Sequence, residues 1–201
     1  VQPGDINNVW TGAGGDDTLA PGLGEDIVFG GETPIEPGDL TDKDFLFLDY
    51  SVDETGDVVT TTVTDGVHQI NRGAPTVGVQ DDFSDELTVG QIEFANIIGT
   101  AGGDQITGFE DALYDGPGDT LEGRDGDDTL ISQGGHSLMT GGAGDDIFLV
   151  TNEFGNPTWD WAHVNYSTST TGIIANLTGS GQFGLDPYEI SDGLGGTDIV
   201  N

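Results

Sequence analysis

The chain has 201 residues, 34% of them hydrophobic, and a formal net charge of −34, because 37 acidic residues stand against only Lys43, Arg72 and Arg124. So few basic residues exclude nucleic acid as a partner, since phosphate binding needs clustered lysine and arginine. The chain has no cysteine, so disulfides cannot stabilise it. It contains no run of about 18 apolar residues, so no transmembrane helix is predicted. Its length allows one elongated body or two small ones.

The N-terminal part holds two units of nine residues, each ending in an aspartate followed by a short apolar segment. They occupy residues 12–29, with Asp17 before Thr-Leu and Asp26 before Ile-Val. A fixed period of this kind indicates a repeat architecture. A polar insertion that contains proline follows at 32–40.

Strand and loop signals follow this first block. The segment 44–51 reads Asp-Phe-Leu-Phe-Leu-Asp-Tyr-Ser, and the β-branched run 58–63 predicts a strand. Residues 71–85 carry glycine, proline and acidic residues, and they predict a loop.

A second repeat block spans 96–149. Its opening resembles the first residues of the chain at a constant offset of 88, and nine-residue units ending at Asp119, Asp128 and Asp146 follow. The last two of these aspartates are 18 residues apart, which is twice the period. The chain contains 35 glycines and no sustained apolar period of 3.6 residues, so we expect an all-β fold.

The end of the chain repeats an earlier part. Asp160–Ser167 matches Asp44–Ser51 at an offset of 116, and residues 198–200 parallel residues 85–87. The sequence stops inside this motif, which predicts a fragment of a longer array. The expected parts are a first repeat block with its insertion at 1–44, a strand and loop region at 45–95, a second block at 96–149, and a region at 150–201 that repeats 36–87.

Each nine-residue unit divides into a glycine-rich turn and a short strand. Glycines allow the positive φ angles that bring turn carbonyl oxygens toward a common point, and the closing aspartate adds a carboxylate oxygen of the kind that calcium prefers. The apolar residue two positions later points inward. Successive units therefore alternate between two sides of a flattened coil of 18 residues, and coils must stack to bury their apolar residues.

This alternation predicts which acidic residues share an edge. In the first block, Asp17 and Asp44 share one edge and Asp26 lies on the other. In the second block, the expected edges are Asp104, Asp128 and Asp146 on one side, and Asp119, Ser137 and Asp160 on the other. Because Ser137 stands where a carboxylate belongs, the edge of Asp119 should bind a cation more weakly.

The segments 12–29, 99–107 and 114–149 resemble the repeats-in-toxin (RTX) family, whose nonapeptide Gly-Gly-x-Gly-x-Asp-x-apolar-x binds calcium. The resemblance implies parallel β-roll (solenoid) segments interrupted by strand and loop insertions. It also implies secretion by a bacterial type I system and folding on meeting extracellular calcium. Two departures are that Pro21 replaces the first glycine of its unit and Ser137 replaces an aspartate.

The resemblance further implies several calcium ions, held by carboxylate and turn carbonyl oxygens. The expected carboxylates are those of Asp17, Asp26, Asp44, Asp104, Asp119, Asp128, Asp146 and Asp160. The expected turn residues are Gly22, Gly24, Gly102, Gly123, Asp125, Gly126, Gly141, Gly142, Ala143 and Gly144. Asp128 and Asp146 should flank one ion.

Histidine and tryptophan offer weaker candidate sites. His68, His136 and His163 lie far apart, without a second histidine or cysteine at zinc-ligand spacing, so we expect them to be solvated or locally packed. Trp159 and Trp161 alternate as in a strand and would present an aromatic platform for a glycan. The alternative is that Trp161 is a capping hydrophobic residue.

The sequence therefore predicts a non-catalytic, calcium-binding structural segment of a large secreted bacterial protein of the adhesin, S-layer or extracellular-matrix type. The alternative is a C-terminal secretion and stability module of an extracellular hydrolase, lyase or epimerase. No Gly-x-Ser-x-Gly elbow supports a serine nucleophile. Expected partners are calcium, further copies of the chain in an array or filament, and an extracellular glycan, without membrane insertion. The expected location is extracellular or at the bacterial cell surface.

Overall fold

The computed structural model describes residues 8–12, 14–22, 26–31, 44–51, 58–64, 67–73, 85–90, 92–109, 118–133, 136–150, 161–165, 174–176, 188–191 and 198–200. Regular structure in these residues consists of strands alone, as the composition predicts. No helix of this part of the chain is therefore long and apolar enough to cross a bilayer.

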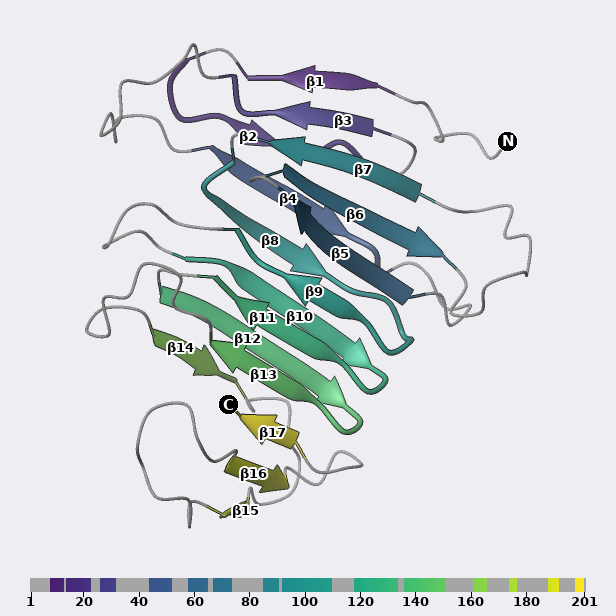
Figure 1. The fold of residues 1–201 in the computed structure, drawn as a ribbon, viewed down its shortest axis with the longest axis vertical. Coiled ribbons are helices and arrows are strands. Elements are labelled where there is room, and N and C mark those ends of the chain that lie inside the picture. The colour runs from purple at the N-terminus through teal and green to yellow at the C-terminus, as the bar shows by residue number, and fades with distance from the viewer. Residues whose placement is uncertain are drawn as a thin grey trace.

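The described strands form two open sheets, and the strands of each sheet follow one another along the long axis of the molecule (Figure 1). The larger sheet has eleven strands in the order β1 (Val9–Thr11), β3 (Asp26–Phe29), β7 (Asp85–Gly90), β6 (Val67–Gly73), β5 (Val58–Thr64), β9 (Gln105–Thr107), β11 (Thr129–Ser132), β13 (Ile147–Val150), β17 (Asp198–Val200), β16 (Tyr188–Ser191) and β15 (Ile174–Asn176). The smaller has six in the order β14 (Trp161–Val164), β12 (His136–Ala143), β10 (Thr120–Asp125), β8 (Phe94–Ile98), β4 (Phe45–Asp49) and β2 (Thr18–Leu19).

From β8 to β14 the chain changes sheet at every strand. The strands β8, β10, β12 and β14 belong to the smaller sheet, and β9, β11 and β13 belong to the larger one. Neighbours within each sheet pair in parallel, and Thr129 opposite Ile147 shows the 18-residue register that the period predicts. The register of β8 with β10 is longer, with Asn96 opposite Thr120, because the insertion before Asp119 adds residues between the two strands.

One apolar core lies between the two sheets. Leu121 and Met139 come from the smaller sheet, and Ile106, Leu130 and Phe148 come from the larger one; all five side chains are fully buried. Burial alternates along β10 and β11, as it does when one face of a strand packs against a core. The inward apolar residue of each unit therefore fixes the register between neighbouring strands.

An antiparallel segment separates the first block from the second in the larger sheet. Strands β5, β6 and β7 pair antiparallel with one another, β7 joins β3, and β5 joins β9. The order β3–β7–β6–β5 recurs as β13–β17–β16–β15 with the same strand directions. The loop predicted at 71–85 is wrong at its ends, because backbone pairing extends β6 to Gly73 and begins β7 at Asp85.

The core predicts different costs for two leucine truncations. Leu130 is fully buried, whereas Leu138 is 38% exposed on the outer face of β12. Leu130→Ala should therefore destabilise the folded chain by about 2–5 kcal/mol through lost burial and a cavity, and Leu138→Ala by less than about 1 kcal/mol. Denaturant unfolding under conditions that fold the parent chain measures both, and equal costs would contradict the assigned inward face.

Candidate metal centre

Three buried aspartates lie one above the next where neighbouring strands of the larger sheet begin. They form a column at one of the two edges that the repeat predicts. Asp104, Asp128 and Asp146 directly precede β9, β11 and β13, and each side chain is at most 2% exposed. The Asp128 N–H donates to Asp146 Oδ1 at 2.9 Å, and the Asp104 N–H donates to Asp128 Oδ1 at 2.8 Å. The Val59 N–H caps the column by donating to Asp104 Oδ1 at 2.6 Å. The spacing therefore placed these three residues correctly on one edge.

The second carboxylate oxygen of each aspartate packs over a glycine five residues earlier. A Cβ atom on Gly123 would overlap Asp128 Oδ2, and one on Gly141 would overlap Asp146 Oδ2. The same Cβ on Gly123 would lie 2.8 Å from the carbonyl oxygen of Gly141, so a carboxylate and a carbonyl oxygen meet beside this glycine. Asp128 Oδ2 is fully buried and accepts no hydrogen bond.

The electrostatic environment of Asp128 strongly disfavours a bare negative charge. The pKa of Asp128 is raised to about 9, mainly by burial and also by the charges of Asp146, Asp104 and Asp127, against the opposing hydrogen bond from the Asp104 N–H. Burial also raises the pKa of Asp104, although the N–H groups of Val59 and Thr100 lower it. A carboxylate in such a site keeps its proton or needs a nearby cation.

The opposite edge, in the smaller sheet, is built differently. Asp119 Oδ1 accepts from the Ala95 N–H at 2.8 Å, and its Oδ2 accepts from the Phe109 N–H at 2.9 Å. The Asp119 N–H donates to Ser137 Oγ at 3.3 Å. Both carboxylate oxygens of Asp119 thus accept a hydrogen bond from a backbone N–H. On the other edge, Asp128 Oδ2 accepts none.

The expected third member of this edge is wrong. The register of β12 with β14 pairs Ser137 with Ala162, so Ala162 and not Asp160 continues the column. The apolar core explains this register, because the same pairing sets Val164 below the buried Met139. Asp160 itself lies outside the described residues.

The first block contains fewer of these hydrogen bonds between a backbone N–H group and a carboxylate. The Asp17 N–H donates to Asp44 Oδ1 at 2.9 Å, and the Asn8 N–H donates to Asp26 Oδ1 at 2.7 Å, so Asp17 and Asp44 share one edge and Asp26 lies on the other, as expected. The Asp44 N–H donates in turn to Glu93 Oε2 at 2.7 Å. Glu93 was not predicted, because it lies outside any nine-residue unit and no sequence signal marks it.

The predicted turn residues occupy stacked turns in the second block. The Gly126 N–H donates to the Ala143 carbonyl at 2.8 Å, and the Asp145 N–H donates to Asp127 Oδ1 at 2.9 Å. Positive φ angles occur at the predicted turn glycines Gly22, Gly126, Gly142 and Gly144. The backbone of Gly102 lies directly against Gly126. Asp125 is exposed, and Gly24 lies outside the described residues.

Carboxylates alone do not make a metal cluster in this part of the chain. Among the described residues, no three histidine, cysteine, aspartate or glutamate side chains come together as a ligand group. The donor set beside Gly123 is instead a carboxylate oxygen of Asp128 with the carbonyl oxygen of Gly141. A hard cation would complete its shell there with further turn carbonyl groups and water.

The histidines are packed or solvated where they are described. His68 is buried, stacks on Phe109 with ring centroids 3.9 Å apart, and contacts the Gly108 carbonyl through Nε2 at 3.0 Å. Burial lowers the pKa of His68, and the hydrogen bond with Gly108 opposes this. His163 is exposed. The side chains of His136 and Trp161, and the whole of Trp159, lie outside the described residues, so glycan contact stays a prediction.

Comparison with protein-family models gives no match for the chain, and comparison with curated proteins gives none either. The geometry of the carboxylate columns therefore carries the functional argument.

The pKa of Asp128 predicts a pH dependence of the metal-free chain. Because this pKa is raised from 3.8 to about 9 in the folded state, the folded chain holds a proton that the unfolded chain has already released at neutral pH. The resulting stability is complete below about pH 4 and is lost as pH rises through about 9. In chelator, the β signal in circular dichroism should therefore be strongest near pH 4 and should fall as pH rises toward about 9, so that a full β spectrum is not reached at neutral pH.

Asp128→Asn supplies the control, because asparagine mimics the neutral acid. This variant should be more folded than the parent chain in chelator at neutral pH, and its β signal should change less with pH. An equally steep pH dependence in the variant would show that another group carries the proton.

Proposed function

We propose that the chain is a non-catalytic, calcium-binding structural segment of a large secreted bacterial protein, of the adhesin, S-layer or extracellular-matrix type. In this proposal its two repeat blocks are parallel β-rolls that fold when calcium binds. The observation that carries it is the buried Asp128, whose Oδ2 accepts no hydrogen bond while two further carboxylates stack on it. Secretion rests on the resemblance of the nonapeptides to the RTX family.

The residues around Asp128 suit a hard divalent cation. Carboxylate and carbonyl oxygens are the ligands that calcium takes, and calcium tolerates irregular shells of six to eight oxygens. A cation beside Asp128 would also offset the repulsion that Asp128 experiences from Asp104 and Asp146. The net charge of −34 gives the whole chain a need for such compensation.

The pairing pattern supports the β-roll within this proposal. Strands of the second block alternate between two sheets with an 18-residue parallel register, which is the path of a flattened coil. The recurrence of the order β3–β7–β6–β5 as β13–β17–β16–β15 supports an array of such units. In that array, calcium-loaded blocks would alternate with antiparallel segments.

The proposal predicts folding controlled by calcium. Without it, charge repulsion and modest apolar content should leave the chain largely disordered. Calcium at roughly 10⁻⁴–10⁻³ M, the range of extracellular modules, should produce a β spectrum. Circular dichroism in chelator and during a calcium titration checks this, with magnesium as the comparison ion. A full β spectrum in chelator at neutral pH would overturn the proposal.

The two edges should respond differently to loss of a carboxylate. Asp128→Ala should weaken calcium binding more than Asp119→Ala, because backbone N–H groups satisfy both oxygens of Asp119 and leave one oxygen of Asp128 without a donor. Calorimetric titration of the two matched variants measures the difference. A larger loss of affinity in Asp119→Ala would place the main calcium site on the opposite edge.

A further inference from the structure

Arg124 occupies a backbone position that elsewhere belongs to glycine. It pairs with Gly142 in the register of β10 and β12, and its φ of 90° matches the left-handed angle of 121° at that glycine. Within the described part of the chain, it is the single residue other than glycine with a positive φ. A side chain at such an angle is strained, and strain of this kind persists where surrounding contacts impose it.

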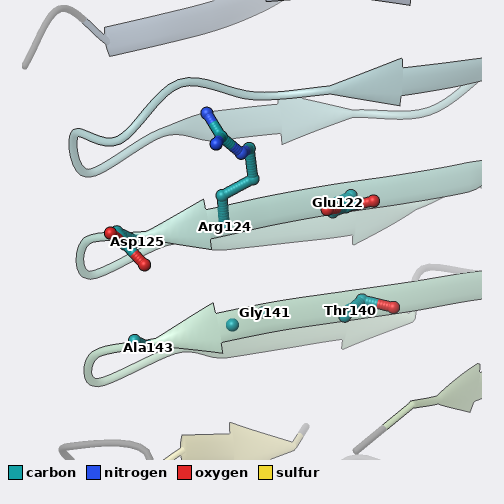
Figure 2. Close-up of a pocket in the computed structure, with 7 residues that line it drawn as sticks. Glu122, Arg124, Asp125, Thr140, Gly141 and Ala143 are labelled. Carbon is teal, nitrogen blue, oxygen red and sulfur yellow. The ribbon is translucent and has the colours of Figure 1, made fainter. Parts of the chain in front are cut away.

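The side chain of Arg124 reaches across a neighbouring strand. Its Nη1 donates to the carbonyl oxygen of Ser51 at 2.8 Å. Ser51 follows β4, and β8 lies between β4 and β10 in the smaller sheet. Figure 2 shows the guanidinium extending from β10 toward the neighbouring coil, away from Gly141 and Thr140 on β12. Arg124 thus joins the end of the first strand region to the second block.

The backbone of Arg124 also lies beside the turn that holds Asp104. The Gly99 N–H donates to the Glu122 carbonyl at 2.8 Å, which sets Gly99 against the start of the next turn. A Cβ atom on Gly99 would overlap Asp104 Oδ2 and would lie 3.0 Å from the carbonyl oxygen of Gly123, the residue before Arg124. Because β8 leads into the turn of Asp104 and lies between β10 and β4, the side chain of Arg124 crosses this part of the chain on its way to Ser51.

The charges around the two aspartates differ accordingly. Burial raises the pKa of Asp104, and the hydrogen bonds from Val59 and Thr100 and, to a smaller extent, the charge of Arg124 oppose this rise. For Asp128, the charged neighbours that shift the pKa are Asp146, Asp104 and Asp127, and all three raise it. One coil further on, Gly142 stands in place of the arginine, beside a hollow of about 260 Å³ that Arg124 also lines.

We propose that Arg124 is a built-in cation that takes the place of one bound calcium ion at the head of the column of Asp104, Asp128 and Asp146. The inference rests on the proposed calcium-binding function. Arg124 acts as a positioning residue: its guanidinium is anchored on Ser51 and supplies the counter-charge for the turn of Asp104. The turns that carry glycine in this place take the counter-charge from solution.

Three variants of the full chain test this by equilibrium dialysis against calcium. Arg124→Gln removes the charge, and Arg124→Gly removes the charge and relieves the backbone strain, so both should bind one more calcium ion per chain than the parent. Arg124→Lys keeps the charge and should keep the parent stoichiometry. In Arg124→Gln, the calcium midpoint of folding should rise by roughly two- to fivefold, the size expected for a partly exposed charge.

The number of bound ions separates this role from a merely structural one. If Arg124→Gln and Arg124→Gly bind as many ions as the parent chain, the arginine does not replace an ion and the inference is overturned, while the calcium-binding function stands. If the parent chain itself binds no calcium, both proposals fall together. A greater stability of Arg124→Gly in chelator, with an unchanged ion count, would assign Arg124 to strain alone.

Discussion

This structure depends on how it accommodates carboxylates that lie directly above one another on neighbouring parallel strands. Where neighbouring parallel strands pair at an offset of 18 residues, the same residue type lies above itself, and the strands are only about 4.8 Å apart. An aspartate that closes each turn is therefore buried against further aspartates, as in Asp104, Asp128 and Asp146. Each backbone N–H in the column satisfies one oxygen of the next carboxylate, and the remaining oxygen must be stabilised in another way.

The acidic and apolar columns hold each other in register. The Oδ2 of each aspartate fills the space beside a glycine, so Gly123 and Gly141 have no room for a Cβ atom. Two residues after each aspartate, Leu130 or Phe148 enters the core. A slip of one residue between coils would expose the apolar side chain and would also separate the carboxylate from its N–H donor. A sequence with both periods in phase therefore specifies one pairing far more strongly than either period would alone.

The period explains what could be predicted from sequence and what could not. Residues repeated at multiples of nine fall on edges by counting, so the column of Asp128 was predictable. The strand at 58–63 was predictable for another reason, its run of β-branched residues. Glu93 joins Asp44 only because β4 pairs directly with β8, a long-range contact that no local pattern encodes. The pairing of Ser137 with Ala162 follows from packing in the core. Arg124 left one signal, an arginine at a glycine position, whose meaning depends on a φ angle and a contact with Ser51.

On the proposed function, the need for a bound cation differs between the aspartates of the column. Asp128 has carboxylates on both sides, whereas Asp104 has the Val59 and Thr100 N–H groups and the charge of Arg124. The head of the second block therefore needs less compensation from solution than its middle. On the proposed function, the coil of Asp104 would order at lower calcium and offer a formed edge to the coil of Asp128. Each further coil would then couple cation uptake to one new layer of packing, because a buried carboxylate and an inward apolar residue enter the stack together.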